Sequence, residues 1–229
     1  PHTLSLSGHT HLHRMIHFGS EDGYTAGTEH LHANLATASG SWYRGHLDIE
    51  GIPDATMLCG APNGWNVLTI DGTDYALEFV PARRPRDHQM SIWIPADEIA
   101  RATLAAGEAE VVVNVFAGSD RSRVRMRLRP TGGGSGGGSG GGDTAIAPTA
   151  WTDLTQTLRP DPFLEARKAL EKSDTPPSGR PLPGLVDSHH IWAATLPADL
   201  PAGHHVIEVE TTDMFGRTFR AVRGMWVRD

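Results

Sequence analysis

The sequence predicts a mostly β protein whose larger part is a β-sandwich-like domain with one short helix. Short segments with alternating apolar residues recur about every ten residues, which is typical of antiparallel sheets packed face to face. Stretches rich in Gly, Pro, Asn and Asp separate these segments, and only one stretch has the apolar spacing of a helix. Six Trp and six Phe supply large side chains for a core.

The first 80 residues are predicted to form short strands joined by loops. We expect strands over 3–6, 12–18 and 34–43, followed by a long loop over 45–66 that is rich in turn-forming residues. Segments 65–70 and 75–80 then form a hairpin, because the Asp71-Gly72 pair between them favours a tight turn.

A second unit is predicted over 81–229, beginning at a Pro- and Arg-rich boundary over 81–86. Alternation of Val124, Met126 and Leu128 with arginines predicts a strand that buries the three apolar residues. Pro160-Asp161-Pro162 is expected to open the helix. The other elements expected in this unit are strands over 88–94, 110–116, 189–195, 205–211 and 218–227, and a helix over 163–172.

A run of Gly and Ser over 132–142 interrupts the second unit. It has no apolar side chain, so we expect a flexible coil that makes no packing contacts. Its regular spacing indicates an engineered linker, and a natural low-complexity loop is the alternative.

Composition excludes several classes of function. A net charge of −7 gives no reason to expect a nucleic-acid partner, and no apolar run is long enough to span a membrane. Cys59 is the only cysteine, so an internal disulfide is impossible, and we expect a buried thiol. Lysine is nearly absent and arginine takes its place, a bias associated with GC-rich bacterial genomes.

Histidines concentrate near the start of the chain. His9 and His11 follow a glycine at a strand end, a local pattern that favours binding of zinc, iron, nickel, cobalt or manganese. His30 and His32 form a second pair that could line a pocket, supply an extra ligand or lie in an exposed loop. Trp42 could line the same pocket or pack at a domain interface. Ser41 lacks a general base at a known spacing, so a turn role is expected.

Gly8-His9-Thr10-His11 resembles Gly-His-x-His, the last metal motif of the calcineurin-like metallophosphoesterases. The resemblance implies that His9 and His11 each hold one ion of a two-metal centre. The family's other motifs, Asp-x-His, Gly-Asp and Gly-Asn-His, precede this one, so they cannot be present in family order. We therefore expect the C-terminal part of a larger enzyme, with 1–80 a remnant of the α/β/β/α phosphoesterase sandwich.

The stretch 81–229 resembles the C-terminal domain attached to a bacterial branch of these enzymes, and upstream segments within 38–64 resemble the same branch. Leu58-Cys59-Gly60 departs from that branch, in which Asp-Gly is expected before Ala61-Pro62-Asn63-Gly64. The stretches that carry the resemblance are 38–43, 51–54, 61–64, 89–90, 114–119, 188–192, 196–205 and 212–219.

By this resemblance, the intact enzyme hydrolyses a phosphoester substrate with divalent Mn, Zn, Fe or Ni ions that activate a water. We expect this chain alone to be inactive, with a companion chain needed for the missing motifs. The alternatives are a non-catalytic accessory or binding β module, and an engineered scaffold derived from it. The compartment stays open, with the periplasm and secretion both compatible with a bacterial source.

Overall fold

The computed structural model describes residues 3–26, 29–130, 148–176 and 179–229. The stretch 132–142, predicted to be a flexible linker, lies outside the described residues. Strands dominate the described part, so the prediction of a mostly β fold is confirmed. The strands are β1 (Leu4–Ser7), β2 (Arg14–Phe18), β3 (His30–Asn34), β4 (Arg44–Leu47), β5 (Pro53–Asp54), β6 (Gly64–Asp71), β7 (Asp74–Pro81), β8 (Met90–Trp93), β9 (Glu98–Ala100), β10 (Glu110–Val115), β11 (Arg123–Pro130), β12 (Thr152–Asp153), β13 (Thr155–Arg159), β14 (Ser188–Thr195), β15 (Gly203–Thr212) and β16 (Thr218–Arg228). The helices are α1 (Arg101–Ala105), α2 (Pro162–Leu170) and the 3-10 turn η1 (Ser20–Asp22).

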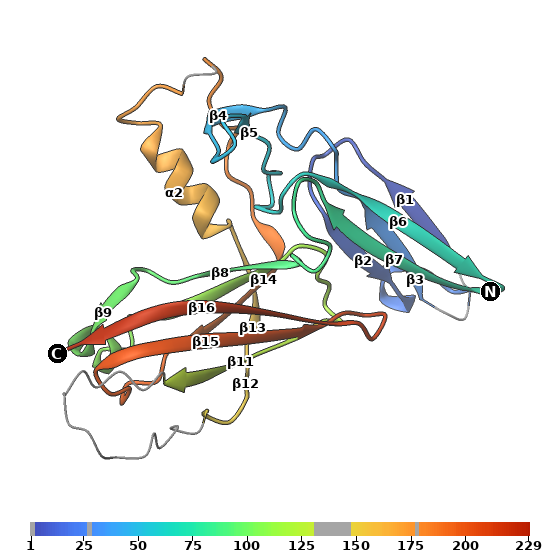
Figure 1. Cartoon of the computed structure of the whole chain (residues 1–229). Helices are drawn as coiled ribbons and strands as arrows, with labels where there is room; N and C mark the ends of the chain where they lie inside the picture. The colour runs from blue at the N-terminus through green and yellow to red at the C-terminus, as the bar shows by residue number, and fades with distance from the viewer. Residues whose placement is uncertain (1–2, 27–28, 131–147, 177–178) are drawn as a thin grey trace.

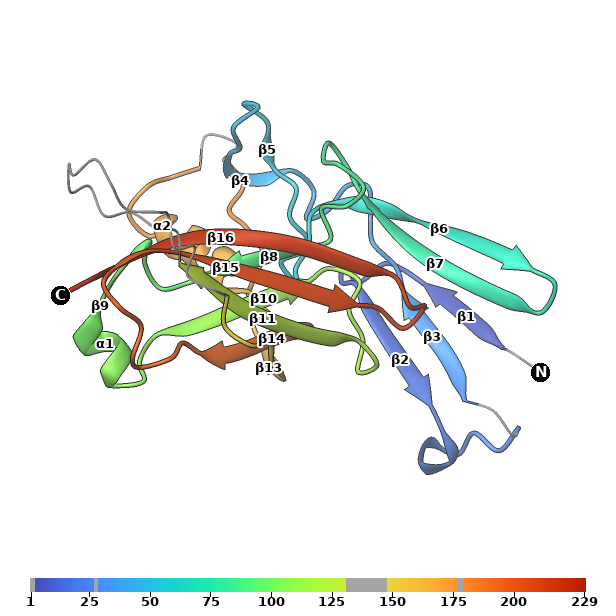
Figure 2. The ribbon, with the colours of Figure 1, turned by 60° about the horizontal axis from the view of Figure 1, so that its bottom comes forward.

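Two sheets form the predicted sandwich (Figure 2). One has the strand order β13-β14-β10-β8 and the other β12-β11-β15-β16-β9. Buried residues of both sheets share one core, in which Val113 and Trp192 of the first sheet join Ile207 and Val209 of the second. Each sheet combines strands that precede residue 131 with strands that follow residue 147. The fold of this unit therefore depends on both halves of the chain.

The strand β11 follows its predicted pattern. Val124, Met126 and Leu128 are buried, with exposed fractions of 2–3%. The alternating arginines lie on the outer face, where Arg125 pairs with Glu210 of β15 and Arg127 pairs with Glu208. The outer face of β11 is therefore covered by cross-strand ion pairs, whereas the sequence showed only the row of arginines.

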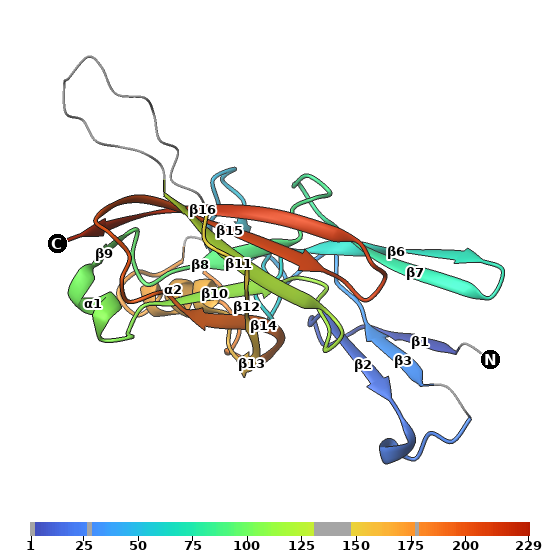
Figure 3. The same ribbon diagram turned by 90° about the horizontal axis from the view of Figure 1, so that it is seen from below.

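A smaller group of strands lies at one end of the sandwich (Figures 1 and 3). The order β1-β3-β2 makes a three-stranded sheet in which β1 runs parallel to β3, and β6 and β7 form the predicted hairpin. Leu31 and Ala33 of β3 bury one face of the small sheet against Leu77 of β7. Phe215, from the turn between β15 and β16, packs against this cluster. The small sheet and the sandwich thus share apolar contacts.

Two predictions for the first 80 residues are wrong in detail. No strand runs over 34–43, because β3 ends at Asn34 and tight turns follow, with Gly40, Trp42 and Tyr43 at φ values of 50, 69 and 53°. Such positive φ values are incompatible with a strand. The hairpin turn is also shifted by one residue: Asp71 pairs with Asp74, and Gly72 takes the left-handed conformation. Within the predicted long loop, β4 and β5 form a short pair.

The helix α2 begins and ends close to its predicted bounds. Asp161 is its N-cap, and its carboxylate accepts a hydrogen bond from the backbone N–H of Leu164 at 2.8 Å, while Pro162 opens the first turn. The sequence analysis did not predict β3, α1, β9, β12 or β13. Each has only two to five residues, too few for a periodic pattern.

A buried amide joins three parts of the fold. Asn114 of β10 donates to the carbonyl of Cys59 at 2.9 Å and to the Asp161 carboxylate at 2.8 Å. Its own oxygen accepts from Nδ1 of His190 on β14 at 2.7 Å. Asn114 is 1% exposed and His190 is fully buried, so water cannot replace these bonds. One side chain thus holds the 55–61 loop, β14 and the start of α2 together.

Two buried histidines predict that the protein loses stability in mild acid. Burial lowers the pKa of His13 to about 4 and that of His190 to about 3, from an ordinary 6.5. The unfolded chain takes up protons at both sites below about pH 6.5, whereas the folded chain does not. Stability therefore falls between about pH 6.5 and pH 4, and at pH 4.5 the two sites together cost about 5 kcal/mol relative to neutral pH. Burial raises the pKa of Asp161, which offsets part of this loss.

Urea unfolding at about pH 7.5, 6 and 4.5 measures this dependence. Each of the substitutions His13→Gln and His190→Gln removes one site at which the unfolded chain takes up a proton. Each should therefore make the free energy of unfolding depend less steeply on pH. His9→Gln is the control, because His9 is exposed. Equal stability of the unmodified chain at all three pH values would contradict the prediction.

Candidate functional site

The loop that carries His9 and His11 begins where β1 ends. His9 has a φ of 78° and His11 a φ of 56°, left-handed values that are uncommon for residues other than glycine. Trp42 and Tyr43, in a neighbouring turn, share this conformation. Backbone strain of this kind costs about 1–3 kcal/mol per residue and tends to cluster at functional sites. The two segments are therefore the first candidate for a site.

Asn34, at the end of β3, anchors the histidine loop. Its amide nitrogen donates to the Thr10 hydroxyl at 2.6 Å and to the Leu12 carbonyl at 2.5 Å, and its oxygen accepts from the Ser7 hydroxyl at 3.0 Å. These contacts lie before, within and after the loop, and Asn34 is 8% exposed. A single buried amide thus fixes the backbone from which both imidazoles project.

The contacts of His11 leave one ring nitrogen available. Nδ1 donates a short hydrogen bond to the Gly40 carbonyl, and the ring lies 4.9 Å from the Trp42 ring, centroid to centroid. Histidines that bind metals commonly donate their other ring N–H to a carbonyl, which fixes the tautomer and directs the free nitrogen at the ion. With Nδ1 so engaged, Nε2 of His11 has the lone pair that a metal ligand needs.

The turn beside His11 requires a glycine at position 40. Gly40 has a φ of 50°, and a Cβ there would lie 1.6 Å from the carbonyl oxygen of Ala55. Sequence reasoning missed both Gly40 and Asn34 as supports of the site. The Ser39-Gly40-Ser41 stretch carries a turn signal that could have indicated Gly40, whereas nothing in the sequence joins Asn34 to Thr10.

His9 and Trp42 lie at the surface of this site. His9 is exposed and has no hydrogen-bond partner within the residues that the structure describes. Trp42 is 58% exposed and Tyr43 42% exposed, and the Trp42 ring lies beside that of His11. Of the residues predicted for the site, the structure brings together His11 and Trp42 directly and places His9 two residues away on the same loop.

His30 and His32 have a different environment. They lie on β3 opposite β1, and hydroxyl groups contact all four of their ring nitrogens at 2.7–3.0 Å. Ser5 bridges the two rings. This arrangement favours a role in pairing β1 with β3, which in turn places the loop that follows β1. The hydroxyl groups come from Thr3, Ser5 and Ser7.

Other groups in the described chain offer little chemistry. Burial raises the pKa of the Cys59 thiol to about 11, so it stays protonated at neutral pH. Among the residues that the structure describes, no three His, Cys, Asp or Glu side chains lie close enough to hold a metal ion together. His9 and His11 would therefore be an incomplete ligand set by themselves.

The fold is a β-sandwich with a small sheet at one end and a histidine loop after β1. The chain belongs to the family described as the C terminal of calcineurin-like phosphoesterase, which matches residues 29–132 and 144–219. A search of curated proteins finds no match. The family resemblance is confirmed, while Gly8-His9-Thr10-His11 lies before the matched part. No helix within the described ranges is long and apolar enough to cross a membrane.

Proposed function

We propose that this chain is the part of a two-metal phosphoesterase that supplies His9 and His11, one nitrogen to each ion. The hydrogen bond from His11 Nδ1 to the Gly40 carbonyl carries this proposal, because it leaves Nε2 free and orients the ring. The left-handed backbone at both histidines supports it, since strain of this kind tends to cluster at functional sites. Trp42 and Tyr43 would border the bound phosphoester.

The ions, Mn, Zn, Fe or Ni, would polarise the phosphoester and supply an activated water. Such centres hold two ions about 3.5–4 Å apart, which requires further ligands around each ion. Two neutral imidazoles cannot offset the repulsion between two divalent cations. The remaining ligands would come from a phosphoesterase part that carries Asp-x-His, Gly-Asp and Gly-Asn-His, on the same polypeptide or on a companion chain.

Activity with and without that part tests the proposal. The chain alone should show no metal-dependent hydrolysis of p-nitrophenyl phosphate or its bis ester with Mn, Zn, Ni or Fe. Together with the phosphoesterase part, it should be active, and His9→Ala and His11→Ala should each reduce kcat/KM at least about 100-fold, because each removes a metal ligand. Gln156→Ala, at an exposed position on β13, is the control and should keep activity within a few-fold.

Two outcomes would contradict the proposal. Metal-dependent turnover by the chain alone, lost in His9→Ala, would show that the missing ligands lie within it, and His30 and His32 would be examined first. Full activity of the reconstituted His9→Ala and His11→Ala variants would remove the metal role.

The second of these outcomes would favour a non-catalytic accessory β module. The family match supports that alternative, because it covers the sandwich and excludes the histidine loop. The gap in the match, over 133–143, coincides with the Gly/Ser stretch. This coincidence supports the view that the Gly/Ser stretch is an inserted linker. It supports the engineered-scaffold alternative for that stretch and not for the rest of the chain.

A further inference from the structure

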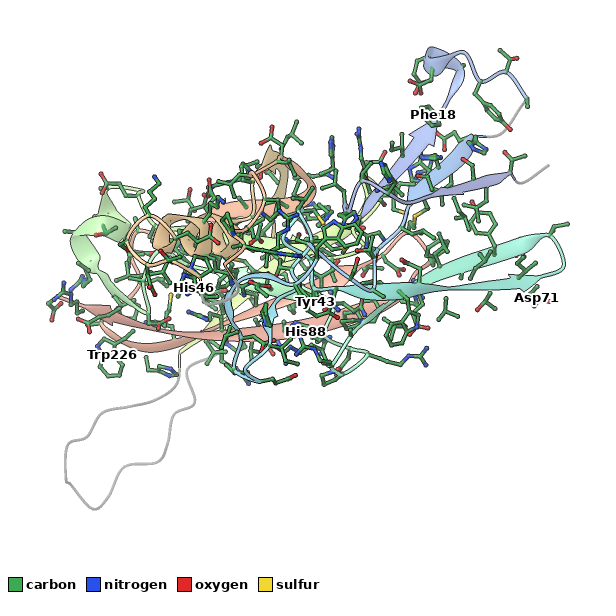
Figure 4. All side chains as sticks on the ribbon, turned by 90° about the horizontal axis from the view of Figure 1, so that it is seen from above. Phe18, Tyr43, His46, Asp71, His88 and Trp226 are labelled. Carbon is green, nitrogen blue, oxygen red and sulfur yellow. The ribbon has the colours of Figure 1, made fainter. Side chains whose placement is uncertain are left out.

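A cavity of about 520 Å³ has a lining that does not include the histidine loop. Its walls come from the loop that carries β4 and β5, the connection between β7 and β8, and helix α2, which lie together above the sandwich in Figure 1. His9, His11 and Trp42 do not line it. The volume is in the range of pockets that bind small molecules. In Figure 4, seen from above, His46 and His88, both lining residues, lie near the middle of the molecule.

The formal charges of the lining cancel. Three arginines, Arg83, Arg84 and Arg167, face three aspartates, Asp48, Asp54 and Asp161. Arg83 contacts the Asp48 carboxylate at 3.0 Å, and Arg167 contacts the Asp54 carboxylate at 2.6 Å. Most of the positive charge at the cavity is already paired, so an anionic ligand would gain little electrostatic attraction to offset its own desolvation.

Hydrogen-bonding capacity nevertheless remains at the cavity. Arg84 makes only long contacts, both from Nη1, at 3.4 Å to Glu50 and 3.5 Å to the Arg83 carbonyl. A guanidinium has five N–H donors, so most of those on Arg84 remain open to a ligand. Donors in this state gain from a ligand that brings oxygen atoms.

Apolar surfaces complete the lining. Phe116, Phe163 and Leu170 contribute side chains, and the His88 ring lies 5.3 Å from that of Phe116. Burial, with Arg84 nearby, lowers the pKa of His88, so its ring is neutral at neutral pH. Arg83, at the cavity, is the one non-glycine residue with a positive φ in the described chain outside the histidine loop and the adjacent turn. Backbone strain thus marks this cavity as well.

We propose that this cavity binds an uncharged, hydroxyl-rich ligand, a monosaccharide or disaccharide unit. A hydroxyl group both donates and accepts, so it can accept from Arg84 and donate to the remaining lone pairs of Asp48 or Asp54 without breaking their ion pairs. The C–H face of a sugar ring packs on Phe163 and Leu170. This binding does not depend on the metal histidines, and it succeeds or fails independently of phosphoesterase activity.

Amide NMR of the whole chain tests the proposal. The probes are uncharged sugars (glucose, galactose, mannose, N-acetylglucosamine, maltose and cellobiose). Inorganic phosphate and glucose 6-phosphate are the charged ligands for comparison. We expect at least one uncharged sugar to shift the amides of 46–49, 54–56 and 82–88, and inorganic phosphate to leave them unchanged. Arg84→Ala should weaken this binding about tenfold, which corresponds to the loss of a charged hydrogen bond.

Arg86→Ala is the matched control. Arg86 lies on the same connection, pairs with Glu78 at 3.2 Å and does not line the cavity, so its loss should leave sugar affinity unchanged. Three results would overturn the proposal: no shift at these amides with any sugar of the panel, tighter binding of inorganic phosphate at the same amides, or sugar binding unaffected by Arg84→Ala. Arg84 is on an exposed connection, so the variant should fold.

Discussion

Expressed alone, residues 151–229 should give no cooperative unfolding transition, whereas the whole chain should unfold in one. The fragment keeps β13 beside β14 and β15 beside β16, but it lacks β10, β11 and β9, which pair with these strands in the whole chain. In the whole chain, Trp192 of β14 pairs with Val113 of β10, and Val209 of β15 pairs with Met126 of β11. Both partners precede residue 131, so each sheet of the fragment would begin with an unpaired edge.

The fragment would also expose half of a core. Ile207, Val209 and Val227 are fully buried in the whole chain, packed against residues that the fragment lacks, among them Val113 and Val124. Unpaired strand edges together with exposed apolar faces favour aggregation over folding. We therefore expect the fragment to be unfolded or aggregated.

Circular dichroism melts and size-exclusion chromatography measure this outcome. The matched control mixes the fragment with residues 1–130 made as a separate chain, which supplies β10 and β11. That mixture should regain a sigmoidal melt, because the missing partners are then present. A monomeric fragment with its own cooperative melt would show that the C-terminal strands fold without the first half.

Asn114→Ala should lower the free energy of unfolding by about 3–5 kcal/mol. The substitution leaves the Cys59 carbonyl, the Asp161 carboxylate and the His190 ring without the partner that they share. Asp161 and His190 are at most 1% exposed, so water cannot compensate. The cost exceeds that of a single hydrogen bond because one buried group is charged.

Urea unfolding at neutral pH measures the loss, with Gln156→Ala as the control. Gln156 lies on β13 in the same sheet but is exposed, so its removal should change stability by less than about 0.5 kcal/mol. A loss below about 1 kcal/mol for Asn114→Ala would mean that the buried groups find other partners, and the network would then not be a link between the parts of the fold.

Local patterns determined much of this protein from the sequence. The alternation of Val124, Met126 and Leu128 was sufficient to predict a strand and its buried face, because a period of two residues is a property of the strand itself. Asp161 with Pro162 was sufficient to indicate the start of α2, since capping involves only the first turn. The family was recognisable because its motifs are contiguous stretches of sequence.

The tertiary structure alone decided which polar residues act together. Trp42 and Tyr43 are residue types that are common in strands, so their sequence favours an extended backbone. In the fold their turn packs closely against the loop at Ala55, beside His11, and both residues have a left-handed backbone. The pairing of β1 with β3 places hydroxyl groups on both nitrogens of His30 and His32, which distinguishes them from His11. Such contacts join residues far apart in the chain, and their geometry depends on the packing of whole sheets, so no local pattern could specify them.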